Sequence, residues 1–308
     1  MMRKIRMTEE KIAAHYREDN MHTPIHLCIG EEATAVGVCF NLSRTDKVFS
    51  NHRNHGHYLA KGGNLKAMIA ELHNKASGCS GGFGGSMHLV ANDVGFPITS
   101  SIVAGGVPIG TGNALAQQMT GSSDVTIVYM GDAASEEGVV YESIAFAVLK
   151  KLPIVYICEN NLYSVGTPLE KREAEGFISN KFTGMLPVVT IDGNDVLEVQ
   201  RVTNEYIEKA RGGEGPAFIE CRTYRFRDHH DTKTGVEAGY QTQEEWDSWK
   251  AKDPILRLGS ELMLQDESFA TAEKNFETEW KRELQDAFSA AAEDSLPKTE
   301  NIAKNLFA

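Results

Sequence analysis

The fold is decided by residues 125–161, which read VTIVYMGDAASEEGVVYESIAFAVLKKLPIVYICENN. Two apolar runs, at 125–130 and 154–158, flank a helical pattern over 137–150. This order predicts a strand, a helix and a second strand that is parallel to the first. Because such crossovers are right-handed, both strands should end at the same edge of the sheet, where open α/β sheets bind ligands.

Polar side chains follow both predicted strands. Asp132 comes just after the first apolar run, and Asn161 comes just after the second. Carboxylate and amide oxygens suit Mg²⁺, which prefers oxygen ligands at roughly 2.0–2.1 Å and often binds phosphate oxygens as well. Ordinary loop chemistry at Gly-Asp and Asn-Asn turns is the alternative interpretation of this pair.

The chain is long enough for one large α/β domain. It has 308 residues, of which 41% are hydrophobic, so it can bury a sizeable core. We expect an α/β domain over residues 1–240, with an N-terminal helical arm. A charged, helical pattern over residues 241–308 predicts an extension packed on the same domain.

Charge, apolar runs and cysteine spacing disfavour several classes of protein. The net charge of −12 disfavours nonspecific binding to nucleic acid or to an anionic membrane. No apolar run approaches the roughly 20 residues of a membrane span, and the basic N-terminus has no apolar stretch behind it. The five cysteines show no paired spacing, which favours reduced thiols and a cytoplasmic location.

The segment 51–58 combines three histidines with an arginine. His52, His55 and His57 could supply imidazoles to a metal. Alternatively, Arg53 could bind phosphate oxygens while a histidine donates a further hydrogen bond. A polar helix start with satisfied histidines is the third interpretation. The anion site is favoured, because an adjacent cation repels a dication.

Other segments predict the remaining framework. The glycine-rich segment 78–88 predicts a loop that lets the backbone approach a ligand or a neighbouring subunit. Glu31 and Glu32 open a predicted helix, where the helix dipole explains them better than a catalytic role. Helices are expected at 8–20, 30–40, 64–76, 109–119 and 196–210, and strands at 48–50, 187–192 and 216–224.

The segment 131–161 also resembles the thiamine-diphosphate motif, which starts Gly-Asp-Gly and ends Asn-Asn. The spacing and the strand–helix–strand context fit, and Ala133 stands where the motif has its second glycine. Further segments carry a wider resemblance: residues 26–33, 53–56, 84–88, 107–110, 159–163 and 223–225 with His229. Together these segments resemble the alpha subunits of the thiamine-diphosphate-dependent 2-oxo acid dehydrogenases, which include the pyruvate, branched-chain and acetoin enzymes.

The resemblance implies a thiamine-diphosphate-binding fold, with a mostly parallel sheet flanked by helices and a helical C-terminal extension. It also implies that Mg²⁺ is held by Asp132, Asn161 and the backbone carbonyl of Tyr163. His52 stands where the family commonly has tyrosine, and Ser101 and Ala104 replace common glycines. The implied cofactor-binding residues are His52, Arg53, Ser101, Val103, Gly131, Asp132, Ala133, Ala134, Asn161, Tyr163 and His229.

The implied catalytic residues are His55 and His229, because imidazole titrates near neutrality and can donate protons or stabilise an oxyanion. The implied reaction is oxidative decarboxylation of a pyruvate-like 2-oxo acid, with acyl transfer to a lipoyl group. In the family, a beta subunit supplies the glutamate that activates the cofactor, usually in an alpha2beta2 tetramer. The resemblance also implies a lipoyl acyltransferase as a further partner.

Three alternatives remain open. An acetoin dehydrogenase or specialised relative is suggested by the departures at Ala133, His52 and Ser101. An inactive alpha-like scaffold is suggested by Ala133 alone. A histidine-cluster metalloenzyme is suggested by segment 51–58.

Overall fold

The computed structural model describes residues 1–18, 21–174 and 176–302. The last residues of the helix expected at 8–20, and residues 303–308 of the expected extension, lie outside this part of the chain. No helix in the described part is both long and apolar enough to cross a membrane.

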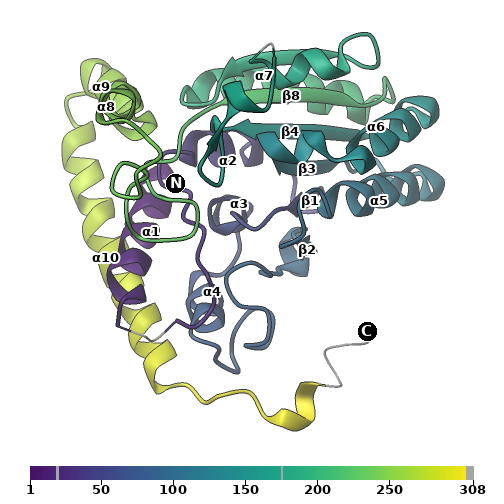
Figure 1. The fold of residues 1–308 in the computed structure, drawn as a ribbon. Helices are drawn as coiled ribbons and strands as arrows, with labels where there is room; N and C mark the ends of the chain where they lie inside the picture. Colours follow the sequence, from purple (N-terminus) through teal and green to yellow (C-terminus); the bar gives the residue numbers. More distant parts are fainter. Residues whose placement is uncertain (19–20, 175, 303–308) are drawn as a thin grey trace.

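A parallel six-stranded sheet forms the centre of the molecule (Figure 1). Its strand order is β2-β1-β3-β4-β8-β7, and each neighbouring pair is parallel. This confirms the predicted α/β class with a mostly parallel sheet. The strands are β1 (Lys47–Ser50), β2 (Ile98–Thr99), β3 (Thr126–Gly131), β4 (Ile154–Asn160), β7 (Val188–Asp192) and β8 (Ala217–Arg222). A separate antiparallel pair is formed by β5 (Tyr163–Ser164) and β6 (Thr167–Pro168).

Helices cover both faces of the sheet, so its central strands are buried on both sides. On β3, Ile127 and Tyr129 join one apolar cluster, whereas Val128 and Met130 join another, because successive side chains point to opposite faces. The first cluster includes residues of α2 (Glu32–Cys39) and α7 (Val196–Arg211). The second includes residues of α5 (Gly106–Thr120) and α6 (Gly138–Lys150). The predicted strand–helix–strand unit is therefore β3–α6–β4, with Met130 opposite Cys158 in the register.

The N-terminal helix begins earlier than predicted. Helix α1 spans Met2–Tyr16, and Thr8 is not its cap: its buried hydroxyl donates to the Lys4 carbonyl oxygen at 2.8 Å. Ile5 and Ile12 are fully buried on the same face of this helix, about two turns apart, and they fix the helix on the domain. The apolar period that begins at Met2 therefore outweighs the capping pattern at Thr8.

The glycine-rich loop closes on a carboxylate of the chain itself. Glu71, on α4 (Leu65–Leu72), is fully buried and accepts four backbone N–H groups of this loop. The donors are Ser80 at 2.8 Å, Gly82 at 2.9 Å, Gly84 at 2.7 Å and Gly85 at 2.9 Å. A Cβ at Gly78 would come within 2.3 Å of the Glu71 carboxylate. The backbone of the glycine-rich loop thus closely approaches Glu71 of the same chain.

The C-terminal region is helical, as the pattern of residues 241–308 predicts. It contains α8 (Gln243–Lys250), α9 (Pro254–Gln265) and α10 (Phe269–Glu293). Helix α10 runs along the side of the molecule opposite α5 and α6 (Figure 1). The ring of Phe288 lies against His15 and His73, with centroid distances of 4.6 and 5.6 Å. The remaining helices are α3 (His55–Ala60) and the 3-10 turns Asn92–Val94, Asp132–Glu136, Leu169–Lys171, Ile178–Phe182 and Thr299–Asn301.

Candidate active site

A cavity of about 210 Å³ lies at the carboxyl edge of the sheet. It gathers side chains and backbone from the ends of β1, β3 and β4, from the start of α5 and from the loop after β8. All the residues predicted to bind the cofactor line it: His52, Arg53, Ser101, Val103, Gly131, Asp132, Ala133, Ala134, Asn161, Tyr163 and His229. The cavity thereby joins segments that are far apart in the sequence, although the individual roles stay predictions.

Asp132 and Asn161 lie where the crossover argument places them. Both are buried, at 2% and 7% exposure. The side-chain amide of Asn161 donates to Glu31 Oε1 at 3.0 Å, and its Oδ1 accepts the backbone N–H of Tyr163 at 3.3 Å. The Asn161 amide is therefore held in one orientation by two neighbours.

Arg172 supplies the positive charge next to Asp132. Its guanidinium donates to Asp132 Oδ2 and also to Glu136. Burial raises the pKa of Asp132, and the Arg172 guanidinium offsets this only in part. A buried carboxylate of this kind needs a cation as its neighbour.

The backbone explains where the family glycines are needed. Ala104 has a φ of +59°, in the left-handed region that favours glycine. Ala133 is not among the residues with positive φ, so a Cβ there causes no backbone strain. Ala133 is one of the residues that line the cavity. Gly131 has open space where a Cβ would lie, so this part of the wall is not crowded.

Val165, which also lines the cavity, has a left-handed backbone conformation like that of Ala104. It has a φ of +54° and is 55% exposed, although β-branched residues rarely adopt that conformation. We expect Val165→Asn to raise the free energy of unfolding by roughly 1 kcal/mol, because asparagine tolerates the left-handed region. Urea unfolding would measure this. Val165→Thr keeps the branched Cβ and should give no gain; an equal gain in both variants would contradict the strain argument.

Arg53 is a buried part of the cavity wall, at 5% exposure. It donates to the carbonyl oxygens of Leu27 at 2.8 Å and His229 at 3.2 Å. Its Nε lies 3.5 Å from Glu31 Oε2, although that oxygen accepts no hydrogen bond in the described part of the chain. Burial raises the pKa of Glu31 to about 7, despite the nearby Arg53. Glu31 thus faces the cavity, which the helix-dipole interpretation did not predict.

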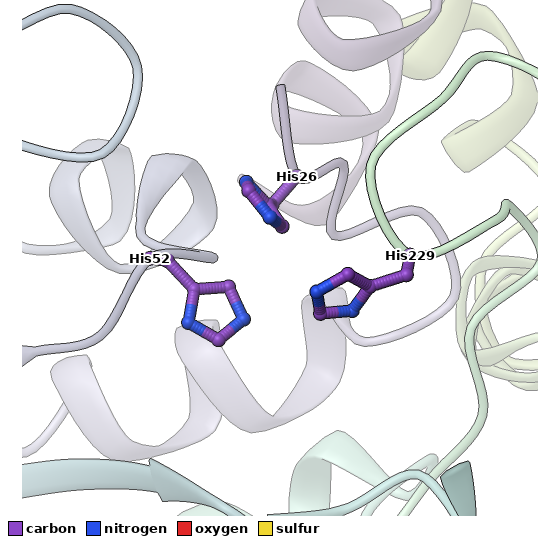
Figure 2. Close-up of side chains that lie close together, drawn as sticks. All are labelled: His26, His52 and His229. Carbon is purple, nitrogen blue, oxygen red and sulfur yellow. The ribbon is translucent and has the colours of Figure 1, made fainter. Parts of the chain in front are cut away.

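His26 joins His52 and His229 on one wall of the cavity (Figure 2). The ring centroids lie 4.6 Å apart for His26 and His52, and 4.9 Å apart for His26 and His229. Burial, followed by the charge of Arg53, lowers the pKa of His52 to about 3 and that of His229 to about 2. The pKa of His26 is lowered by the same causes. The sequence segment 26–33 supported the family resemblance, but it gave His26 no role.

These neutral rings make stability depend on pH. Because the folded-state pKa values lie below the unfolded value of about 6.5, the unfolded chain binds more protons between the two. We expect the free energy of unfolding to fall as the pH drops below about 6.5, by at most roughly 1.4 kcal/mol per pH unit for each ring. Urea midpoints from pH 7 to pH 5 would show this. His52→Asn should flatten the dependence, and an unchanged slope would contradict the assignment.

His55 and His57 lie away from the cavity. The ring nitrogens of His55 contact Glu9 Oε1 at 2.7 Å and Ser86 Oγ at 2.8 Å, and its side chain is fully buried. His57 contacts Ser50 and Glu159 instead. The metal site considered for His52, His55 and His57 is therefore wrong, because the three rings contact different partners. The geometry places His55 as a link between α1 and the glycine-rich loop, not against the cavity.

The chain matches known proteins over nearly its whole length. Residues 1–300 match the family "Dehydrogenase E1 component". The chain belongs to this family. The resemblance to the alpha subunits of the thiamine-diphosphate-dependent 2-oxo acid dehydrogenases is thereby confirmed.

Two kinds of relative are similar to the chain. The alpha subunit of acetoin:2,6-dichlorophenolindophenol oxidoreductase from Bacillus subtilis is 35% identical over 308 residues, covering 99% of this chain and 91% of the relative. The mitochondrial pyruvate dehydrogenase E1 alpha subunits (somatic form) of Rattus norvegicus and Homo sapiens are each 33% identical over 308 residues. Those two matches cover 100% of this chain and 78% of each relative. The two kinds are almost equally similar, so identity alone does not choose between their substrates.

Proposed function

We propose that this chain is the alpha subunit of a heteromeric enzyme that oxidatively decarboxylates a pyruvate-like 2-oxo acid and transfers the acyl group to a lipoyl group. One observation carries the proposal: a single cavity at the carboxyl edge of the sheet gathers the residues predicted for the diphosphate and its metal. Family membership supports the same chemistry. The cofactor would be thiamine diphosphate with Mg²⁺.

The donor set fits a hydrated magnesium diphosphate. Asp132, Asn161 and the Tyr163 carbonyl would supply oxygen ligands, which Mg²⁺ prefers. Asp132 is a buried carboxylate that already pairs with a cation, Arg172. Binding of Mg²⁺ would replace this ion pair, because two positive charges cannot share the same carboxylate oxygens without repulsion. Glu31 would keep the Asn161 amide turned so that its oxygen can serve as a ligand.

Thiamine diphosphate, when bound, supplies the carbanion that attacks the 2-oxo carbon and the electron sink for decarboxylation. The residues of this chain would bind the cofactor and orient it. Arg53 would hold the diphosphate through its forked N–H groups, while its own contacts keep it in place. His229 would donate a hydrogen bond to the developing oxyanion, since its depressed pKa keeps the ring neutral.

A beta subunit would complete the site. Ile102 and Val103 are 72% and 49% exposed beside the cavity, although such apolar side chains are normally covered. Their place at the cavity rim suits a partner that closes the cofactor between two chains. An alpha2beta2 assembly, a lipoyl acyltransferase as acceptor and a cytoplasmic location belong to the same proposal.

Acetoin is the second candidate substrate, because an acetoin-oxidising relative is 35% identical to the chain. Turnover of the reconstituted alpha–beta pair with pyruvate, branched-chain 2-oxo acids and acetoin separates the two. The proposal predicts carbon dioxide release and lipoyl acylation with a small 2-oxo acid. Turnover of acetoin and of no 2-oxo acid would contradict the proposal and favour acetoin as the substrate. If the enzyme binds the cofactor but turns over none of these substrates, both candidate functions are rejected.

A further inference from the structure

Three imidazoles from separate segments lie close together (Figure 2), and all three residues line the cavity. His26 precedes α2, His52 follows β1 and His229 lies in the loop after β8. One nitrogen of each ring lies within 4.8 Å of the other two. Among the residues that the structure describes, this is the only group of three or more histidine, cysteine, aspartate or glutamate side chains that could share a metal.

We propose that His26, His52 and His229 form a binding site for a divalent transition-metal ion such as Zn²⁺, with its fourth position open to the cavity. Imidazole nitrogen is a preferred zinc ligand, and open zinc sites commonly have three protein ligands. Mg²⁺ prefers oxygen, so this site and the one at Asp132 select different metals. The inference does not rest on the proposed decarboxylation.

To bind one ion, the three ring nitrogens, which now lie within 4.8 Å of one another, must come closer together. Two nitrogens on a tetrahedral zinc ion lie about 3.4 Å apart, because each Zn–N bond is about 2.0–2.1 Å. His52 and His229 are only partly buried, which leaves them room to turn toward His26. His26 is 7% exposed, and its Nδ1 has no hydrogen-bond partner within the described ranges. A metal would satisfy this buried nitrogen.

Arg53 is the charge that opposes metal binding. Its Nη2 lies 3.4 Å from His229 Nδ1, and Arg225 adds a second positive charge near His52 and His229. Two carbonyl oxygens hold the Arg53 guanidinium in place, and Glu31 compensates part of its charge. Repulsion should therefore weaken binding into the micromolar range without abolishing it. An anion as fourth ligand would face both the metal and Arg53.

Metal binding here would obstruct the cavity. The three rings line the same space as Asp132 and Asn161. A zinc ion held by them would occupy part of this cavity. If the cavity is the active site, micromolar Zn²⁺ should inhibit the turnover of the alpha–beta enzyme, and a chelator should restore it.

Cobalt titration tests the site directly. Co²⁺ is added to the full-length chain without cofactor, in excess Mg²⁺ so that oxygen sites are saturated. We expect one equivalent to bind with a Kd of about 10 μM or tighter, to give the intense visible absorption of four-coordinate Co²⁺, and to be displaced by Zn²⁺. His52→Asn and His26→Asn should each weaken binding by more than the roughly 10–100-fold that loss of an outer partner costs.

His230→Asn is the matched control. His230 neighbours His229, but its side chain is 59% exposed and outside the cluster, so its loss should leave Co²⁺ binding unchanged. Circular dichroism identifies a variant that fails to fold. If His52→Asn or His26→Asn does not fold, Co²⁺ binding by the other of these two variants tests the proposal. The proposal is overturned if a folded His52 or His26 variant binds Co²⁺ normally. It is also overturned if Asp132→Asn abolishes the absorption, or if the Kd is weaker than about 1 mM.

Discussion

Asp132→Asn should lower kcat/KM of the reconstituted alpha–beta enzyme by about 10³-fold or more. Loss of a charged metal ligand removes several kcal/mol of stabilisation, and about 1.4 kcal/mol corresponds to a tenfold change in rate. The buried carboxylate is the only charged group among the three predicted magnesium ligands, Asp132, Asn161 and the Tyr163 carbonyl. Steady-state kinetics at saturating Mg²⁺ and thiamine diphosphate would measure the loss.

Glu136→Gln is the control for this prediction. Glu136 shares Arg172 with Asp132, but it is not among the cavity-lining residues. The control should therefore retain activity within a few-fold, since it removes a carboxylate without removing a metal ligand. Equal losses in both variants would show that the Arg172 ion-pair network matters, and would contradict the ligand role of Asp132.

Glu71→Ala should destabilise the chain by about 3–5 kcal/mol, the range seen when one partner of a buried charged interaction is removed. The change leaves four backbone N–H groups of the glycine-rich loop without their acceptor. Because His55 contacts Ser86 of the same loop, the disruption should also reach α3. Urea unfolding of the purified chain would measure the destabilisation.

Glu142→Ala is a matched control on the exposed face of α6. It removes the same side chain from a helix, without a buried partner, and should change stability by less than about 0.5 kcal/mol. Hydrogen exchange of residues 80–85 adds a local readout. Unchanged protection of these amides in Glu71→Ala would contradict the account of the loop.

Much of this architecture could be predicted from local patterns. The apolar runs of β3 and β4 with the helical period of α6 define a crossover, and its handedness places Asp132 and Asn161 at one edge. The cofactor-binding residues that the family resemblance implies also meet in one cavity. The crossover could be predicted because it depends on periodicity and strand direction, which short stretches of sequence specify.

Contacts between distant segments could not be predicted in the same way. The cavity is lined by His26 and Glu31, and Asp132 pairs with Arg172. The segments that contain these three residues carry no local signal of such contacts. His55 has the same residue type and neighbourhood as His52, yet its ring faces Glu9, because α1 packs on that side. The glycines of residues 78–88 indicated a close backbone approach, but only the structure shows that Glu71 is the group approached.

Calorimetric titration of thiamine diphosphate, with and without Mg²⁺, into the chain together with its beta partner tests the central claim most directly. The account predicts binding that requires Mg²⁺, that is stronger with the partner present, and that Asp132→Asn abolishes. Magnesium-independent binding, or no binding by a well-folded alpha–beta complex, would contradict it. The second result would favour an inactive scaffold whose cavity is closed to the diphosphate by the methyl group of Ala133.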